Sequence, residues 1–120
     1  MSTNEVLREV NKIKLIYKNE AYTGFSVVTS IKTYSLSITS RDYCCEDWGI
    51  DVKEYNTDLI GSNVIRIGWC NRKFYDHDSA CIKIETDSGT FYIVAHNDHN
   101  GYYPHDVLAI FGDKYDPQTI

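Results

Sequence analysis

Residues 81–96, CIKIETDSGTFYIVAH, decide the fold class of this chain. The first six residues alternate apolar and polar side chains, whereas the last seven are largely apolar on both faces. Alternation with a period of two is typical of a half-buried β-strand, and a continuous apolar run is typical of a central strand. Asp87, Ser88 and Gly89 lie between the two halves, and glycine supplies the positive φ that a short hairpin turn requires. The stretch therefore predicts an antiparallel β-hairpin.

Five other segments predict further strands. In residues 12–18, Ile13, Leu15 and Tyr17 alternate with lysines, which we expect to point towards water. The other four segments are FSVVTS (25–30), TYSLSITS (33–40), NVIRIGWC (63–70) and VLAIFG (107–112). The polar residues 71–79, NRKFYDHDS, predict a loop, and residues 113–120, DKYDPQTI, predict a tail.

The N-terminal segment STNEVLREVNK (residues 2–12) predicts a short helix. Ser2 or Thr3 could cap it, and Val6, Leu7 and Val10 follow one another at helical spacing. With 120 residues, ten tyrosines, four phenylalanines and a single methionine, the chain has the length of one domain and a composition that favours strands. We expect one domain, residues 1–120, that is mainly β with α+β as the alternative: an antiparallel sheet or a small barrel or sandwich of about six to eight strands.

An internal repeat is a further expectation. At an offset of 57 residues, Thr29 falls on Thr86, Leu36 falls on Ile93, and YCCEDW (43–48) falls on NGYYPH (100–105). With a gap of five residues, the segment 13–17 falls on 65–69, which gives pseudo-repeats 12–55 and 64–112. The alternative is that any two hairpins with a period of two align this well. If the repeat is real, a pseudo-twofold axis would bring the two unusual loops together into one composite site.

Charge and cysteine content limit the partners and the compartment. The formal net charge of -5 and the lack of a basic stripe disfavour duplex nucleic acid as a partner. The start of the chain is polar, and no apolar run approaches the roughly 18 residues that span a bilayer, so we expect no membrane association. The four cysteines (Cys44, Cys45, Cys70, Cys81) are then expected to be reduced in a cytoplasm.

Metal and thiol chemistry are both disfavoured. His96, His99 and His105 are suitable zinc ligands, but their spacing does not converge on one ion, so we expect solvated histidines, no metal and no cofactor. Cys44 or Cys45 beside a histidine would suit a thiol enzyme, but no residue pattern orients a base or builds an oxyanion hole. We therefore expect no catalytic residues.

Ligand or partner binding is the remaining interpretation of the segment HNDHNGYYPHD (96–106). Asn100-Gly101 predicts a turn, and the tyrosines beside it offer large amphipathic contacts for a protein or for stacked bases. Structural packing of the tyrosines stays open as an alternative. The candidate binding residues are Asn97, Asn100, Gly101, Tyr102 and Tyr103, together with Cys44, Cys45, Glu46 and Trp48 from the other loop.

Four short motifs in order resemble a family of small uncharacterised domains encoded by phages and prophages. They are the Cys-Cys-Glu step at 44–46, the Asp-Leu-Ile-Gly step at 58–61, the hairpin with Thr86 and Gly89, and the Asn-Gly-Tyr-Tyr step at 100–103. The match would cover roughly residues 22 to 111. The resemblance implies a viral origin and a mostly β domain, and it implies no enzymatic activity.

The viral resemblance leads to the functional expectation. We expect a phage-derived, non-enzymatic binding protein in the host bacterial cytoplasm that counters antiviral defence by binding a host defence protein. One alternative is sequestration of a small nucleotide immune signal, and a further alternative is a zinc- or thiol-dependent enzyme. The oligomeric state stays open, since the edge of residues 12–18 could support a homo-oligomer but carries lysines.

Overall fold

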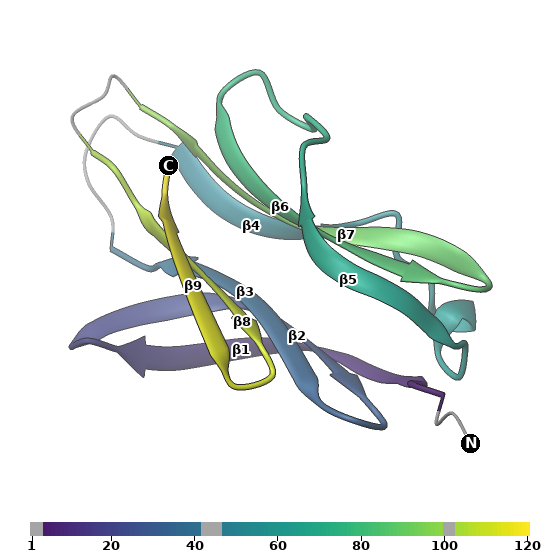
Figure 1. The fold of residues 1–120 in the computed structure, drawn as a ribbon. Coiled ribbons are helices and arrows are strands. Elements are labelled where there is room, and N and C mark those ends of the chain that lie inside the picture. The colour runs from purple at the N-terminus through teal and green to yellow at the C-terminus, as the bar shows by residue number, and fades with distance from the viewer. Residues whose placement is uncertain (1–3, 42–46, 100–102) are drawn as a thin grey trace.

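A computed structural model describes residues 4–41, 47–99 and 103–120, which form two antiparallel sheets (Figure 1). The strands are β1 (Leu7–Tyr17), β2 (Glu20–Thr29), β3 (Thr33–Thr39), β4 (Asp47–Lys53), β5 (Val64–Cys70), β6 (Asp78–Thr86), β7 (Gly89–Asp98), β8 (Asp106–Phe111) and β9 (Lys114–Thr119). One sheet has the order β1-β2-β3-β8-β9, and the other has the order β4-β7-β6-β5. The chain is therefore mainly β, as the sequence predicts.

The two sheets lie face to face around an apolar core (Figure 1). The alternating apolar residues of β3 and β7 supply the centre of this core, and Leu36, Ile38, Phe91 and Ile93 have no exposed area. Burial of such side chains stabilises a fold by roughly 1.5–3 kcal/mol each, which explains why the alternation along the sequence is strict here. Among the described residues, the one helical element is the 3-10 turn η1 (Thr57–Leu59), and no helix could cross a membrane.

The two sheets share one pairing scheme at an offset of 57 residues. Strands β1, β2 and β3 form a meander in the first sheet, and β5, β6 and β7 form a meander in the second. The strand that follows each meander joins the other sheet, so β4 pairs with β7 and β8 pairs with β3. Equivalent rungs are Val27–Tyr34 and Ile84–Phe91 within the meanders, and Ile38–Val107 and Ala95–Ile50 at the joining strands.

Irregular features recur at the same offset. A bulge separates Leu7 from Glu9 in β1, and a bulge separates Val64 from Arg66 in β5. The turn after β2 and the turn after β6 each contain a buried threonine whose hydroxyl bonds the backbone three residues ahead, Thr29 to Lys32 and Thr86 to Gly89. Rung Val10–Val27 corresponds to Ile67–Ile84, so the pairing contains no gap of five residues between the first strands of the two units.

The outer face of the five-stranded sheet is lined by small side chains where the sheet bends. Ser35 and Ser37 of β3 are buried there, and Gly24 of β2 lies opposite Ser37. A Cβ atom at Gly24 would lie 2.1 Å from the carbonyl oxygen of Leu36, so only glycine allows this close approach. The bend lets the two edge strands meet, and the Tyr17 and Tyr115 rings stack with centroids 5.5 Å apart.

The predicted N-terminal helix is wrong for the described residues. Val6 forms a bridge to Asn63, and β1 begins at Leu7. Leu7 and Val10 both face the core although they are three residues apart, because the bulge after Leu7 inserts one extra residue into the strand. A bulged strand therefore imitates the spacing of a helix.

Two strands lie outside the segments that the sequence analysis assigned. In β4, Trp48, Ile50 and Val52 alternate and pack on the core, so the period of two was present in the sequence but was overlooked. The predicted tail contains β9, which pairs only with β8 at the edge of its sheet. An edge strand tolerates Pro117, and the polar composition of β9 gives no apolar alternation to detect.

Candidate functional site

Three of the predicted binding residues lie together at one end of the sandwich. Trp48 in β4 lies opposite Asn97 in β7, and the Asn97 side-chain amide donates to the carbonyl oxygen of Tyr103 at 2.9 Å. The two segments that the sequence analysis joined into one composite site are therefore neighbours where the structure describes them. The other predicted binding residues lie outside the described residues: Cys44, Cys45, Glu46, Asn100, Gly101 and Tyr102.

Asn97 is part of the scaffold. It is 1% exposed, and its amide nitrogen also donates to the carbonyl oxygen of Ile120 at 3.2 Å. The amide thus joins β7 to the segment before β8 and to the C-terminal residue. Because both amide hydrogens point at backbone carbonyls, Asn97 is not available to donate to a nucleotide base, which corrects one role that the sequence suggested.

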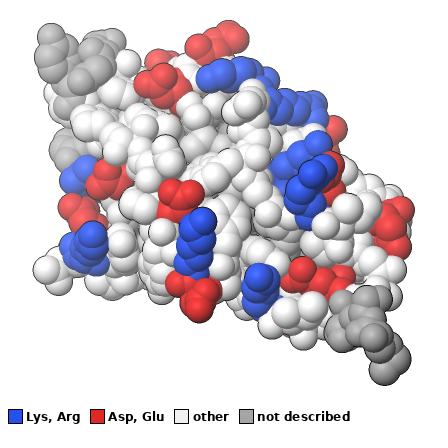
Figure 2. All heavy atoms as spheres, in the orientation of Figure 1, with Lys and Arg blue, Asp and Glu red and all other residues white. Residues whose placement is uncertain are grey.

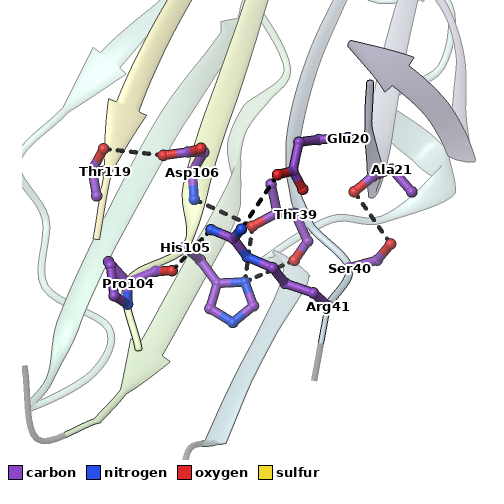
Figure 3. Close-up of polar contacts among 9 residues, drawn as sticks. All are labelled: Glu20, Ala21, Thr39, Ser40, Arg41, Pro104, His105, Asp106 and Thr119. Carbon is purple, nitrogen blue, oxygen red and sulfur yellow. Dashed lines mark hydrogen bonds and ion pairs between the residues drawn. The ribbon is translucent and has the colours of Figure 1, made fainter. Parts of the chain in front are cut away.

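His105 anchors the same end of the molecule from below. It is fully buried, and its Nδ1 lies 2.7 Å from the carbonyl oxygen of Thr39 (Figure 3). A carbonyl oxygen can only accept, so Nδ1 carries the hydrogen and donates it. The Thr39 hydroxyl in turn accepts from the backbone amide of Asp106 at 3.2 Å. The Trp48 ring packs against the imidazole with centroids 4.9 Å apart, so the position of Trp48 is fixed by a buried polar network.

Arg41 spans the rim of this end. Its guanidinium donates to Glu20 and to the carbonyl oxygen of Pro104, both at 3.3 Å, as Figure 3 shows. It therefore connects the start of β2 with the segment before β8. Since Arg41 and Glu20 are each more than one-third exposed, solvent screens this pair, and it orders the rim more than it stabilises the fold.

A cavity of about 420 Å³ opens beside the rim, on the concave outer face of the five-stranded sheet. Its lining residues are Tyr17, Lys18, Glu20, Tyr22, Asp106, Pro117, Gln118 and Thr119. Burial, and after it the negative charge of Asp106, raises the pKa of Tyr22. The carboxylates of Glu20 and Asp106 make this cavity unfavourable for a phosphate group.

The histidines of residues 96–106 do not form a metal centre. His96 bonds His77 at 3.0 Å and stacks on Tyr75, whereas the His99 ring lies 3.8 Å from Asp78 and His105 bonds Thr39. Within the described ranges, no group of three or more histidine, cysteine, aspartate or glutamate residues could hold a metal ion. The expectation of solvated histidines is wrong, because the side chains of His96, His99 and His105 are 12%, 7% and 0% exposed.

The sequence analysis missed Thr39 and Arg41 as parts of this site. The strand pattern of residues 33–40 contained a signal, because Thr39 and Ser40 end an apolar strand just before the unusual loop. Their partners could not be found, since the contacts from Thr39 to His105 and from Arg41 to Pro104 join segments more than 60 residues apart.

Charged side chains are mixed over the described part of the face in Figure 2, where lysines and arginines lie beside aspartates and glutamates. Two of these contacts are Arg66 with Glu85 at 2.7 Å and Lys83 with Glu85 at 3.2 Å. Comparisons with protein-family models, curated proteins and solved structures found no match.

Proposed function

We propose that this chain is a non-enzymatic binding protein of phage origin that counters host antiviral defence by binding a host defence protein. The binding surface is the end of the sandwich that carries Trp48 and Tyr103. Recognition residues commonly lie in loops that a rigid scaffold positions, because a preordered surface loses less entropy on binding.

The observation that carries the proposal is the buried polar network beneath this surface. Asn97 bonds the backbone of Tyr103, and His105 bonds Thr39 while its ring supports Trp48. These contacts hold one aromatic residue from each predicted binding segment in a fixed place. Tyrosine and tryptophan are the residues most often responsible for affinity at protein interfaces.

The four motifs of the phage family divide into two groups, and the division supports the same surface. Thr86 and Gly89 form the β6–β7 turn, while Leu59 is buried and Gly61 has a φ of 92°, so these two motifs have structural roles. The other two motifs, residues 44–46 and 100–103, adjoin Trp48 and Asn97 in the sequence. A family that shares them without an evident structural need would be expected to share a partner.

A nucleotide immune signal is the less favoured ligand. The Asn97 amide is already bonded to two carbonyl oxygens, and the carboxylates of Glu20 and Asp106 line the neighbouring cavity. A zinc- or thiol-dependent enzyme is also less favoured, since burial raises the pKa of the Cys81 thiol and thereby disfavours its nucleophilic thiolate.

We also propose that the chain contains two copies of one unit, a three-strand meander followed by a joining strand. Support comes from rungs, bulges and threonine turns that correspond at an offset of 57 residues. Val6 pairs with Asn63, and Trp48 packs on His105, so residues equivalent at this offset meet each other at both ends of a pseudo-twofold axis. The binding surface would then lie where the axis leaves the molecule.

The test is affinity capture of the tagged protein from extract of phage-infected host cells, followed by native mass spectrometry. We expect a stoichiometric host protein, and we expect Tyr102→Ala combined with Tyr103→Ala to weaken its binding about 30-fold or more. Tyr115→Ala is the matched control, because Tyr115 is 52% exposed on β9, outside the predicted binding segments. An adduct of nucleotide size would favour the alternative, and the absence of any partner or adduct would contradict both.

A further inference from the structure

Cys70 and Cys81 face each other across the last rung of the β5–β6 ladder. Their sulfur atoms are 2.7 Å apart, and both residues are free thiols in the structure. Opposed residues of antiparallel strands have Cα atoms about 4.5–5.5 Å apart, which lies within the range that a disulfide spans. The equivalent rung at the offset of 57 is Ile13 with Gly24, so the fold itself does not demand two cysteines here.

The pair is accessible from the surface. A hollow of about 290 Å³ is lined by Cys70, Asn71, Arg72, Lys73, Ser79 and Cys81. Cys70 is partly exposed, whereas Cys81 is 2% exposed. A reagent that enters the hollow therefore meets Cys70 first.

Two basic side chains stand in the wall of this hollow. Lys73 is exposed and forms no ion pair with any residue in the described ranges, while Arg72 lies over the Phe74 and Tyr92 rings. Positive charge beside a thiol attracts anionic reagents and favours the thiolate form. The positive charge of Arg72 also acts to lower the pKa of Cys81, against the larger opposing effect of burial.

We propose that Cys70 and Cys81 form a redox modification site that is oxidised to an intramolecular disulfide by small anionic disulfides of the glutathione type. Cys70 loses its proton to solvent, and its thiolate attacks one sulfur of the reagent. The reagent's sulfur–sulfur bond breaks, and one thiolate leaves and takes up a proton. The Cys81 thiolate, having lost its own proton, then attacks the Cys70 sulfur and releases the second reagent thiol. Two protein thiols are oxidised and one disulfide is reduced to two thiols.

The disulfide would close the base of residues 71–80. Phe74 and Tyr75 of this segment cover the outer face of the four-stranded sheet, and β5 is an edge strand held by β6 alone. A covalent link between β5 and β6 would hold this edge in place and restrict the unfolded chain. Oxidation is therefore expected to raise the melting temperature by about 5–10 °C.

The experiment uses the full chain with Cys44→Ser and Cys45→Ser, so that only the facing pair reports. The reduced protein is incubated with glutathione disulfide, and intact mass and peptide mapping follow the products. We expect loss of two hydrogens, a Cys70–Cys81 link and the rise in melting temperature. A dithiol that persists, or a stable glutathione adduct on Cys70 with Cys81 present, would overturn the proposal.

Variants test the order of attack and the role of charge. Cys81→Ser is expected to accumulate one glutathione on Cys70, whereas Cys70→Ser is expected to react at least tenfold more slowly because Cys81 is buried. Arg72→Gln with Lys73→Gln should slow oxidation by glutathione disulfide about tenfold and leave oxidation by uncharged hydroxyethyl disulfide unchanged. Equal slowing with both reagents would overturn the proposed preference for anions.

Discussion

The tip of the β1–β2 hairpin and the segment between β5 and β6 occupy equivalent places but have different structures. Residues 14–23 lie between the rung Ile13–Gly24, and residues 71–80 lie between the rung Cys70–Cys81, so both segments have the same length. The first segment continues the ladder as a hairpin to the turn at Lys18 and Asn19. The second leaves the β5–β6 ladder and folds back onto its own sheet.

The side chains explain the difference. Residues 14–17 continue the strand alternation, and Lys18 and Asn19 adopt the positive φ values of 50° and 65° that a two-residue hairpin turn needs. Residues 71–77 do not alternate, and they carry aromatic residues that find partners on the outer face. The Phe74 ring packs edge-on against Tyr92 at 5.1 Å, and the Tyr75 ring stacks on His96 at 4.1 Å.

The comparison teaches that the two sheets share their inner faces and differ in their outer faces. The first sheet has Gly24, Ser35 and Ser37 outside, and these small side chains let the sheet bend until its own edges meet. The second sheet has Cys81, Tyr92 and Val94 outside, which form a separate apolar cluster that needs a cover. The free hairpin and the folded-back segment are two consequences of this one difference.

The largest expected effect tests the bend. Gly24→Ala places a Cβ atom 2.1 Å from a backbone oxygen, so we expect a loss of about 4 kcal/mol in the free energy of unfolding, or no folding at all. Gly68→Ala is the matched control, because Gly68 lies in a strand of the other sheet and a Cβ atom there meets nothing within 4 Å. Urea denaturation measures both. Equal effects of the two substitutions would show that the bend at Gly24 is not required.

The second effect tests the cover of the outer face. Phe74→Ala removes a half-buried ring from the cluster around Tyr92, and we expect a loss of about 2 kcal/mol in the free energy of unfolding. Ile16→Ala changes the tip of the free hairpin, where Ile16 is 71% exposed, and should change stability by less than about 0.5 kcal/mol. The difference would vanish if residues 71–77 did not pack on the sheet.

The third effect tests the equivalence of the two turns. Thr29→Val and Thr86→Val each remove a hydroxyl that accepts from two backbone amides, so each should cost about 1–2 kcal/mol. Under the proposed duplication the two losses agree within about 0.5 kcal/mol after correction for the extra bond from Thr29 to Glu5. A large cost at only one turn would argue that the two hairpins are not equivalent.

Sequence patterns predicted those parts of the fold that depend on a period of two. The strands at 33–40 and 81–96 were recognised because one face of each is apolar and the turn between β6 and β7 contains glycine. The bulge in β1 could not be recognised, because inserting a residue changes the phase of the pattern. The edge strand β9 could not be recognised either, because burial imposes no pattern on a strand with one neighbour and few buried side chains.

The candidate site was predictable in location but not in its supporting contacts. The unusual composition of residues 43–48 and 96–106 indicated that Trp48 and Tyr103 belong to one site. The residues that hold them were assigned other roles, because a buried asparagine or histidine looks like an exposed one until its carbonyl partners are known. Those partners depend on which strands change sheets, and one sequence does not determine that.

The smallest expected effect is a dependence on pH that only the second sheet should show. Burial, and then the positive charge that His77 can carry, lowers the pKa of His96 below its ordinary value of 6.5. The unfolded chain therefore binds more protons than the folded chain as the pH falls through 6.5, and the stability that neutral His96 allows is present above this pH and lost below it. Residue Thr39 holds the equivalent place in the first sheet and does not titrate, so His96→Gln should flatten the melting temperature between about pH 7.5 and 5.5. An unchanged slope in this variant would mean that another group, and not the histidine beneath Tyr75, makes the outer face of the second sheet sensitive to acid.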